Sequence, residues 1–129
     1  MSSFRFAISG AVIVLFALSS GRAAGQGSPQ AGTSPVPATP DSIAAGKQTY
    51  LRRCASCHAA TGEGGPGNDL IPAAPSLVDE PVKVKTDSQV FNNIKNGIGP
   101  DFNMVAFKDT LKDDEIWNVV NYLRSIAKK

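Results

Sequence analysis

The chain has 129 residues, 13 basic and 11 acidic side chains, a formal net charge of +2 and two cysteines. This length suits one small domain. Arg5 and Arg22 lie close to the N-terminus, and the rest of the chain has 11 basic and 11 acidic residues. A nearly neutral domain has no basic stripe for a phosphate backbone, so the composition does not indicate nucleic-acid binding.

The first 24 residues have the pattern of a bacterial export signal. Arg5 precedes an apolar run of 13 residues at 6–18, and small residues follow it. The pattern predicts a signal peptide over residues 1–24, cleaved near Ala23 or Ala24, and therefore a periplasmic protein. A span of the bilayer needs about 20 apolar residues, so a retained membrane anchor is the less favoured alternative.

Residues 25–40 are rich in Gly, Ala, Ser, Thr, Gln and Pro and contain almost nothing apolar beyond Val36. Such a composition cannot bury enough surface to fold by itself, and its prolines keep it partly extended. We therefore expect a linker at 25–40 and a folded domain at 41–129.

The first expected helix runs from Ser42 to Cys54, with Asp41 or Ser42 as its N-cap. One apolar face at helical spacing consists of Ile43, Gly46 or Lys47, Tyr50 and Cys54. Glycine inside a helix costs about 0.5–1 kcal/mol relative to alanine. We interpret Gly46 as a point where another helix crosses closely, and a neutral surface glycine is the alternative.

The pentapeptide Cys54-Ala55-Ser56-Cys57-His58 has the spacing C-x-x-C-H, which is typical of covalent haem attachment. Each thiol can add to one haem vinyl group and form a thioether bond. The adjacent imidazole of His58 is then placed at the iron as an axial ligand. The sequence therefore predicts one covalently bound haem c.

Other chemistries of a C-x-x-C pair fit less well. A zinc site needs four ligands, but His58 is the only histidine and the chain has no further cysteine. A thioredoxin-like dithiol would follow a strand, whereas the flanks here are predicted to be helical. A disulfide between Cys54 and Cys57 would close a very short loop and stabilise little.

The segment from Ala59 to Pro75 is a predicted loop rich in glycine and proline. No strand precedes it and no Gly-Lys-Ser/Thr ends it, so it is not a phosphate-binding loop. Glycines give clearance for a chain that passes close to a flat macrocycle. An iron-bound imidazole also needs an acceptor for its second N–H, and we expect the carbonyl of Pro66 or of a neighbour in this loop.

A second helix is predicted from Asp87 to Asn96. Thr86 and Gln89 form a T-x-x-Q capping box at its start, and Gly97 ends it. Its apolar stripe consists of Val90 or Phe91, Ile94 and Ile98.

The irregular segment that follows contains Met104, the only methionine other than Met1. A lone methionine is often a flexible core residue. Its thioether is nevertheless a soft donor suited to iron, and no second histidine competes for the position. We predict Met104 as the second axial ligand, flanked by Phe102, Val105 and Phe107, which would exclude water. An open iron or a lysine ligand is the alternative.

The third helix is predicted from Asp113 to Ala127. Acidic residues in its first turn and basic residues near its end match the helix dipole. Its buried stripe consists of Ile116, Val119 or Val120, Leu123 and Ile126, with Trp117 and Tyr122 beside it. No segment alternates like a strand. The expected fold is all-α, with three main helices and loops wrapped around one covalent haem.

Together these motifs resemble the class I c-type cytochromes, of the short bacterial mono-haem kind. The resemblance rests on five segments: Ala45 to His58, Gly62 to Pro66, Val90 to Pro100, Met104 to Phe107 and Glu115 to Ser125. It implies that His58 and Met104 are the axial pair. It also implies that Gly46 and Tyr50 meet Val119 and Tyr122 where the first and last helices cross.

The sequence departs from this family at two places. Val105 follows the ligand methionine where the family often has proline, and such a change would make the loop less rigid. Lys112 stands where many relatives have a serine cap for the last helix. Thr110 or Asp113 is therefore the expected cap.

The resemblance implies an electron carrier rather than an enzyme: a monomer that passes single electrons between redox proteins such as a dehydrogenase and a terminal oxidase. Membrane association is expected only if the N-terminal segment is retained. Lysines 83, 85, 95 and 108 form either a weak basic rim at the docking face or an ordinary solvated surface. Three alternatives stay open: a permanent subunit of a periplasmic dehydrogenase or oxidase, a haem enzyme or gas sensor with an open iron, and a thiol-redox protein without haem.

Overall fold

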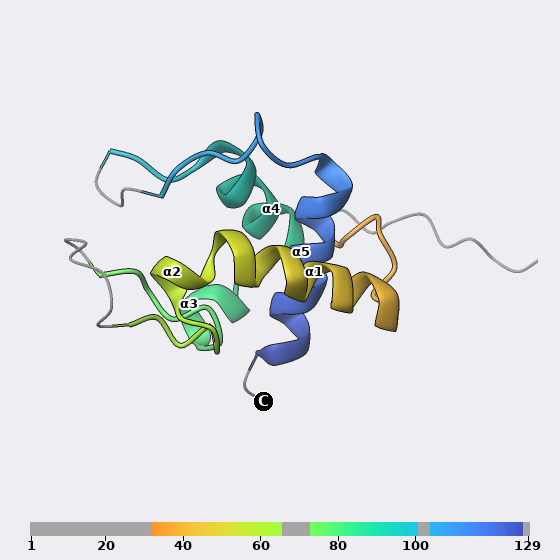
Figure 1. Cartoon of the computed structure of the whole chain (residues 1–129), viewed down its shortest axis with the longest axis horizontal. Coiled ribbons are helices and arrows are strands. Elements are labelled where there is room, and N and C mark those ends of the chain that lie inside the picture. The colour runs from red at the N-terminus through yellow and green to blue at the C-terminus, as the bar shows by residue number, and fades with distance from the viewer. Residues whose placement is uncertain (1–31, 66–72, 101–103, 128–129) are drawn as a thin grey trace, which may run out of the picture.

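A computed structural model describes residues 32–65, 73–100 and 104–127 (Figure 1). In these residues the chain forms five helices: α1 (Pro40–Arg53), α2 (Ala55–His58), α3 (Glu80–Lys83), α4 (Asp87–Asn96) and α5 (Asp113–Ile126). The predicted signal peptide, the first part of the predicted linker, Pro66 and Phe102 lie outside the described residues. No described helix has the length and hydropathy needed to cross a bilayer.

The prediction of an all-α fold with three main helices is confirmed. The three long helices lie close to their predicted bounds, and the only β-type pairing among the described residues is an isolated bridge between Ile98 and Met104. The two four-residue helices, α2 and α3, were not predicted, because one turn is too short to show a helical period in the sequence.

The start of α1 differs from its prediction. Thr39 is the N-cap, and its hydroxyl accepts a hydrogen bond from the amide of Ser42 at 3.1 Å. Pro40 occupies the first helical position, where its missing N–H costs nothing. The predicted caps, Asp41 and Ser42, therefore lie inside the first turn.

Helices α1 and α5 cross at Gly46, as the sequence predicts (Figure 1). A Cβ atom built on Gly46 would lie 1.9 Å from the carbonyl oxygen of Asn118 and 3.0 Å from the Cβ of Tyr122. One turn further along α1, the rings of Tyr50 and Tyr122 lie 5.3 Å apart. The absence of a side chain at Gly46 is therefore what lets the two helix backbones meet.

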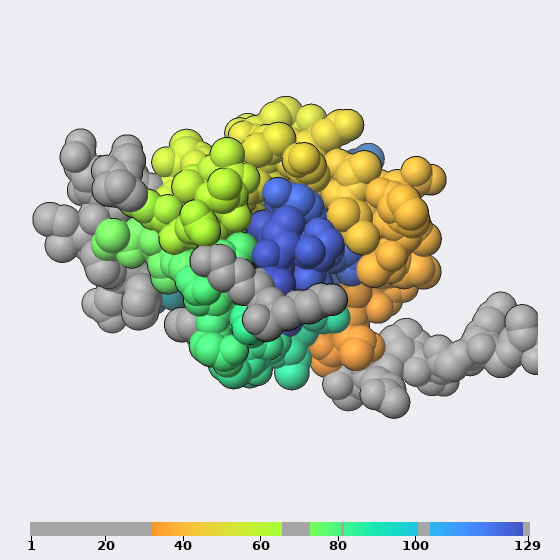
Figure 2. All heavy atoms as spheres, turned by 90° about the horizontal axis from the view of Figure 1, so that it is seen from below, coloured from red at the N-terminus to blue at the C-terminus, as the bar shows by residue number. Residues whose placement is uncertain are grey.

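The core lies between this helix pair and α4. Ile116, Val119 and Val120 of α5 are at most 1% exposed. Phe91 of α4 stacks on Trp117 of α5 with ring centroids 4.2 Å apart. Figure 2 shows the end of α5, in blue, enclosed by the orange and yellow residues of α1 and the green residues around α3. Most of the buried apolar residues form one cluster: Tyr50, Val82, Val90, Phe91, Ile94, Leu111, Ile116, Val119, Val120, Tyr122 and Leu123.

The caps of α4 are confirmed, whereas that of α5 is not. Thr86 and Gln89 form the reciprocal capping box, and Gly97 ends α4 with a φ of 73°. At α5 the N-cap is Lys112, whose backbone N–H donates to Glu115 Oε2 at 2.9 Å. Thr110 and Asp113 are not the cap: Asp113 is the first residue of α5, and Thr110 lies two residues before Lys112.

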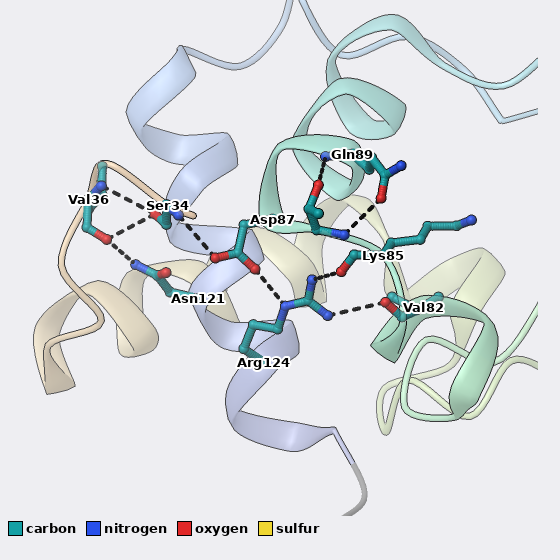
Figure 3. Close-up of polar contacts among 9 residues, drawn as sticks. Ser34, Val36, Val82, Lys85, Asp87, Gln89, Asn121 and Arg124 are labelled. Atoms are coloured by element: carbon teal, nitrogen blue, oxygen red, sulfur yellow. Dashed lines mark hydrogen bonds and ion pairs between the residues drawn. The ribbon is translucent and has the colours of Figure 1, made fainter. Parts of the chain in front are cut away.

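Residues 34–37 precede α1 and are tied to α4 and α5 by hydrogen bonds (Figure 3). The amide of Ser34 donates to Asp87 Oδ2 at 3.0 Å, and Asn121 Nδ2 donates to the carbonyl of Val36 at 3.0 Å. Asp87 Oδ1 also accepts from Arg124 Nε at 2.7 Å. This part of the predicted linker is therefore held against the helices.

Gly46→Ala is expected to destabilise the protein by about 1–3 kcal/mol or more, because the added methyl group overlaps a backbone carbonyl that cannot turn away. Chemical denaturation at equilibrium measures the change. Gly65→Ala is the matched control, since a Cβ there would lie 3.8 Å from its nearest neighbour, the Cβ of Ala59. Equal stability of the two variants would contradict the close crossing.

Asp87→Asn is expected to lower the free energy of unfolding by about 1.5–3 kcal/mol, because Arg124 loses a charged acceptor in a mostly buried site. Glu80→Gln provides the control: Glu80 pairs with Lys83 at 2.9 Å but its side chain is 73% exposed. The control should cost about 0–1 kcal/mol. A smaller loss of unfolding free energy for Asp87→Asn than for Glu80→Gln would show that the ion pair between Asp87 and Arg124 does not stabilise the protein.

Candidate haem site

The two cysteines lie at the junction of α1 and α2. Cys54 ends α1 and precedes α2, and its carbonyl accepts hydrogen bonds from the amides of Cys57 at 3.1 Å and His58 at 2.9 Å. This single tight turn brings Cys54, Cys57 and His58 together. Both cysteines are half-buried and neither forms a disulfide.

The environment of Cys54 does not suit a redox dithiol. Burial, and secondly the neighbouring Cys57, raise the pKa of the Cys54 thiol to about 11. A reactive dithiol has a lowered thiol pKa, because the thiolate is the nucleophile. The described residues also contain no group of three or more His, Cys, Asp or Glu side chains that could hold a metal ion. The raised pKa of the Cys54 thiol weakens the thiol-redox alternative.

His58 is almost completely buried, with 8% of its surface exposed. Its Nδ1 lies 3.1 Å from the carbonyl oxygen of Pro75, so this ring nitrogen donates its proton there and Nε2 keeps its lone pair. Burial lowers the pKa of His58, and the hydrogen bond to Pro75 opposes this only in part. The neutral imidazole is thus oriented as a metal ligand, with a backbone carbonyl as its outer partner.

The acceptor for this imidazole is in the predicted loop, but it is Pro75 at the end of the loop. Pro66, the carbonyl that the sequence analysis favoured, lies outside the described residues. The sequence spacing of the loop alone could not predict Pro75 as the acceptor, because that depends on the path by which the loop comes back to His58. The amide of Leu77 donates to the carbonyl of Gly62 at 2.7 Å, which brings the two ends of the loop together.

Tyr50 is a functional candidate that the sequence analysis treated only as a packing residue. Its side chain is 0% exposed. Its hydroxyl donates to the carbonyl of Ala59 at 2.7 Å and to that of His58 at 3.3 Å. In the sequence, Tyr50 lies eight residues before His58, but this spacing does not show which carbonyl accepts from the hydroxyl. Only the three-dimensional structure shows that.

Met104 lies in the segment between α4 and α5. The amide of Ile98 donates to its carbonyl at 2.9 Å, and its own amide donates to the carbonyl of Ile98 at 3.2 Å. This pairing follows directly from the turn at Gly97. Met104 is half-buried and packs against the core cluster, as does Phe107, whereas Val105 is 66% exposed. Of the two described residues expected to flank Met104, only Phe107 is packed in this way.

The segment that holds Met104 and the segment around α2 extend to the same side of the crossed helices, on the left of Figure 1. These two segments carry two thiols, one imidazole and one thioether. That set fits a covalently attached haem with one nitrogen and one sulfur ligand. Hard cations such as magnesium prefer oxygen ligands instead.

Two of the four lysines proposed as a basic rim are paired with carboxylates. Lys83 contacts Glu80 at 2.9 Å, and Lys95 contacts Asp113 at 2.8 Å. The ammonium group of Lys95 also lies 5.4 Å from the ring centroid of Phe91. These charges are partly neutralised, which favours the interpretation of an ordinary solvated surface.

The comparison with known proteins identifies the family. Residues 41–123 match the family described as cytochrome C oxidase, cbb3-type, subunit III. The chain belongs to the class I c-type cytochromes. Its cofactor is one covalently bound haem c, and its family is one of electron carriers. No curated protein matches the sequence significantly.

Solved structures show the same fold. Cytochrome cL of the marine methylotrophic bacterium Methylophaga aminisulfidivorans is 26% identical, with a TM-score of 0.56 over 70% of this chain and 59% of that one. Cytochrome c6 of the diatom Phaeodactylum tricornutum is 28% identical, with a TM-score of 0.51 over 66% and 93%.

A chain of the reducing HAO-like protein complex of Kuenenia stuttgartiensis is 24% identical, with a TM-score of 0.61 over 73% of this chain and 47% of that one. At this identity the likeness shows the fold alone. The cytochrome spans between 46% and 59% of the first three structures that it matches.

The burial of neutral His58 predicts a loss of stability in acid. Folding lowers the pKa of His58, so as the pH falls the unfolded chain binds a proton before the folded one does. The free energy of unfolding is therefore unaffected by His58 above the ordinary histidine pKa of about 6.5, and it decreases below that pH. The free energy of unfolding should fall by at most about 1.4 kcal/mol per pH unit.

Urea denaturation of the haem-free protein, in which no iron holds the imidazole, measures this slope at pH 7.0, 6.0 and 5.5. His58 is the only histidine of the chain, so no other imidazole contributes to this slope. A free energy of unfolding that stays constant from pH 7.0 to 5.5 would contradict a His58 that is buried in the neutral form.

Proposed function

We propose that this cytochrome carries single electrons between redox proteins in the bacterial periplasm. Cys54 and Cys57 would hold the haem through thioether bonds, and His58 and Met104 would be the axial ligands of the iron. The observation that carries the proposal is the hydrogen bond from His58 Nδ1 to Pro75, which leaves Nε2 available beside the two thiols.

Each of these side chains has a defined task in the proposed site. His58 binds as a neutral imidazole, and the Pro75 carbonyl makes it a stronger donor. Met104 supplies a thioether, a ligand that raises the reduction potential relative to two histidines. When bound, the haem supplies the one-electron chemistry, its iron alternating between the ferrous and ferric states. Packing of Met104 and Phe107 against the core limits access of water.

With two protein ligands the iron would have no free coordination position for a substrate. The proposed function is therefore that of an electron carrier and not of an enzyme. Its partners would be redox proteins that dock briefly near the haem edge, since electron-transfer contacts are small and transient. Periplasmic location rests on the export pattern of residues 1–24, which precedes the described part of the chain.

A second candidate function is a permanent cytochrome subunit of a periplasmic dehydrogenase or oxidase. It is favoured by the family description, which names a subunit of a cbb3-type cytochrome C oxidase. The same haem site would serve both functions. Copurification of the native protein with a larger redox enzyme through gel filtration would support the subunit, whereas elution as a small monomer would support the mobile carrier.

The deciding experiment uses the mature protein, made in a host that attaches haem c. The carrier predicts a covalent mass increase of one haem, a reversible one-electron titration and no carbon monoxide complex in the ferrous state. Rapid binding of carbon monoxide would instead support a haem enzyme or gas sensor with an open iron. A polypeptide of unmodified mass would reject the haem site itself.

Met104→Ala is expected to remove the near-infrared band of thioether-bound ferric haem and to lower the reduction potential, because the sulfur ligand is lost. The ferrous variant should also bind carbon monoxide. Val105→Ala is the neighbouring control, since Val105 is exposed and cannot replace the ligand. An unchanged spectrum and potential in Met104→Ala would exclude Met104 as the ligand.

A further inference from the structure

The residue after His58 has an unusual backbone conformation. Ala59 has φ 63° and ψ 159°, and among the described non-glycine residues it alone has a positive φ. This region of the backbone map is populated almost only by glycine, because a Cβ atom is strained there. Such strain persists only where the surrounding structure holds the residue in place.

The surrounding contacts all converge on the carbonyls of this turn. Tyr50 Oη donates to the carbonyl of Ala59 at 2.7 Å and to that of His58 at 3.3 Å. The amide of Gly64 donates to the carbonyl of His58 at 3.1 Å, and the amide of Gly62 to that of Ala59 at 3.2 Å. Among the described residues, only Tyr50 contributes bonds from outside the loop, and it belongs to helix α1.

The turn and the imidazole are parts of one arrangement. His58 is restrained at its backbone carbonyl by Tyr50 and Gly64, and at its ring by the carbonyl of Pro75. The strained turn at Ala59 directs the chain into the loop that returns with Pro75. If the backbone of Ala59 moved to an unstrained conformation, the carbonyls of His58 and Pro75 would change their positions relative to each other.

We propose that the Tyr50 hydroxyl is a positioning group for the axial ligand: it holds the strained turn at Ala59 and thereby fixes the direction of the His58 ring. The proposal rests on the proposed function, in which His58 binds the haem iron. A ring that only filled the core would not need the hydroxyl, since phenylalanine has almost the same shape.

The test compares four haem-loaded variants with the wild type: Tyr50→Phe, Ala59→Gly, the double variant, and Tyr122→Phe as the control. Tyr122 is the other ring of the aromatic pair, 5.3 Å from Tyr50, and belongs to α5. NMR of the reduced protein reports the resonances of the His58 ring, and amide hydrogen exchange reports the opening of the turn at Gly62 and Gly64. Redox titration gives the potential of each variant.

Tyr50→Phe should shift the His58 resonances and the potential, and should speed exchange at Gly64 about tenfold, as expected for the loss of one net hydrogen bond. Ala59→Gly should leave the His58 resonances unchanged, because glycine adopts this turn without strain. In the double variant the resonances and the potential should return toward the wild-type values. Tyr122→Phe should change none of these readouts.

Two outcomes would overturn the proposal. In the first, Tyr50→Phe lowers thermal stability but leaves the His58 resonances and the potential unchanged, which means that the hydroxyl is merely structural. In the second, the double variant stays as shifted as Tyr50→Phe. Failure of the proposed function is separate, because it appears in the wild type as the absence of covalent haem or of a His58 ligand signal.

Discussion

The close approach of α1 and α5 at Gly46 is the constraint on which the rest of the structure depends. Because the carbonyl of Asn118 occupies the space of a side chain at Gly46, the two helices can approach this closely only where α1 has a glycine. This crossing places Tyr50 against Tyr122 and brings the end of α1, with Cys54, to one side of the helix pair. Cys54 therefore lies at a fixed distance along α1 from the point where α1 and α5 cross.

The residues around His58 lie a short distance along the chain from that crossing. Tyr50 lies four residues after Gly46, and its hydroxyl reaches the turn that follows His58. On the far side of the loop, Pro75 returns to the imidazole. The Met104 segment depends on α4 instead, because the turn at Gly97 permits its pairing with Ile98. Two separate supports thus hold the two proposed axial ligands.

The sequence predicted the parts of this protein that depend on local patterns. The capping box of Thr86 and Gln89, the helix periods and the unusual position of Gly46 are all readable over a few residues. The spacing of Cys54, Cys57 and His58 alone makes them candidates for the haem site, since two thiols and an imidazole in this order suit few other chemistries.

What the sequence could not predict depends on contacts between distant segments. The choice of Pro75 as acceptor requires the path of the whole loop, and the partner of the Tyr50 hydroxyl requires the turn at Ala59. The composition of residues 34–37 is that of a linker, yet polar groups of α4 and α5 hold their backbone. The composition of a segment indicates how much apolar surface it can bury, but not which distant side chains form hydrogen bonds with its backbone.

These N-terminal contacts mean that the first helix does not mark the edge of the stable unit. Asn121 is only 4% exposed, and its amide donates to the carbonyls of Val36 and Pro37 and to Ser42 Oγ. A shortened recombinant protein that started at Pro40 would leave part of this amide without acceptors. The smallest version suited to crystallisation or fusion to another protein should therefore start before Ser34.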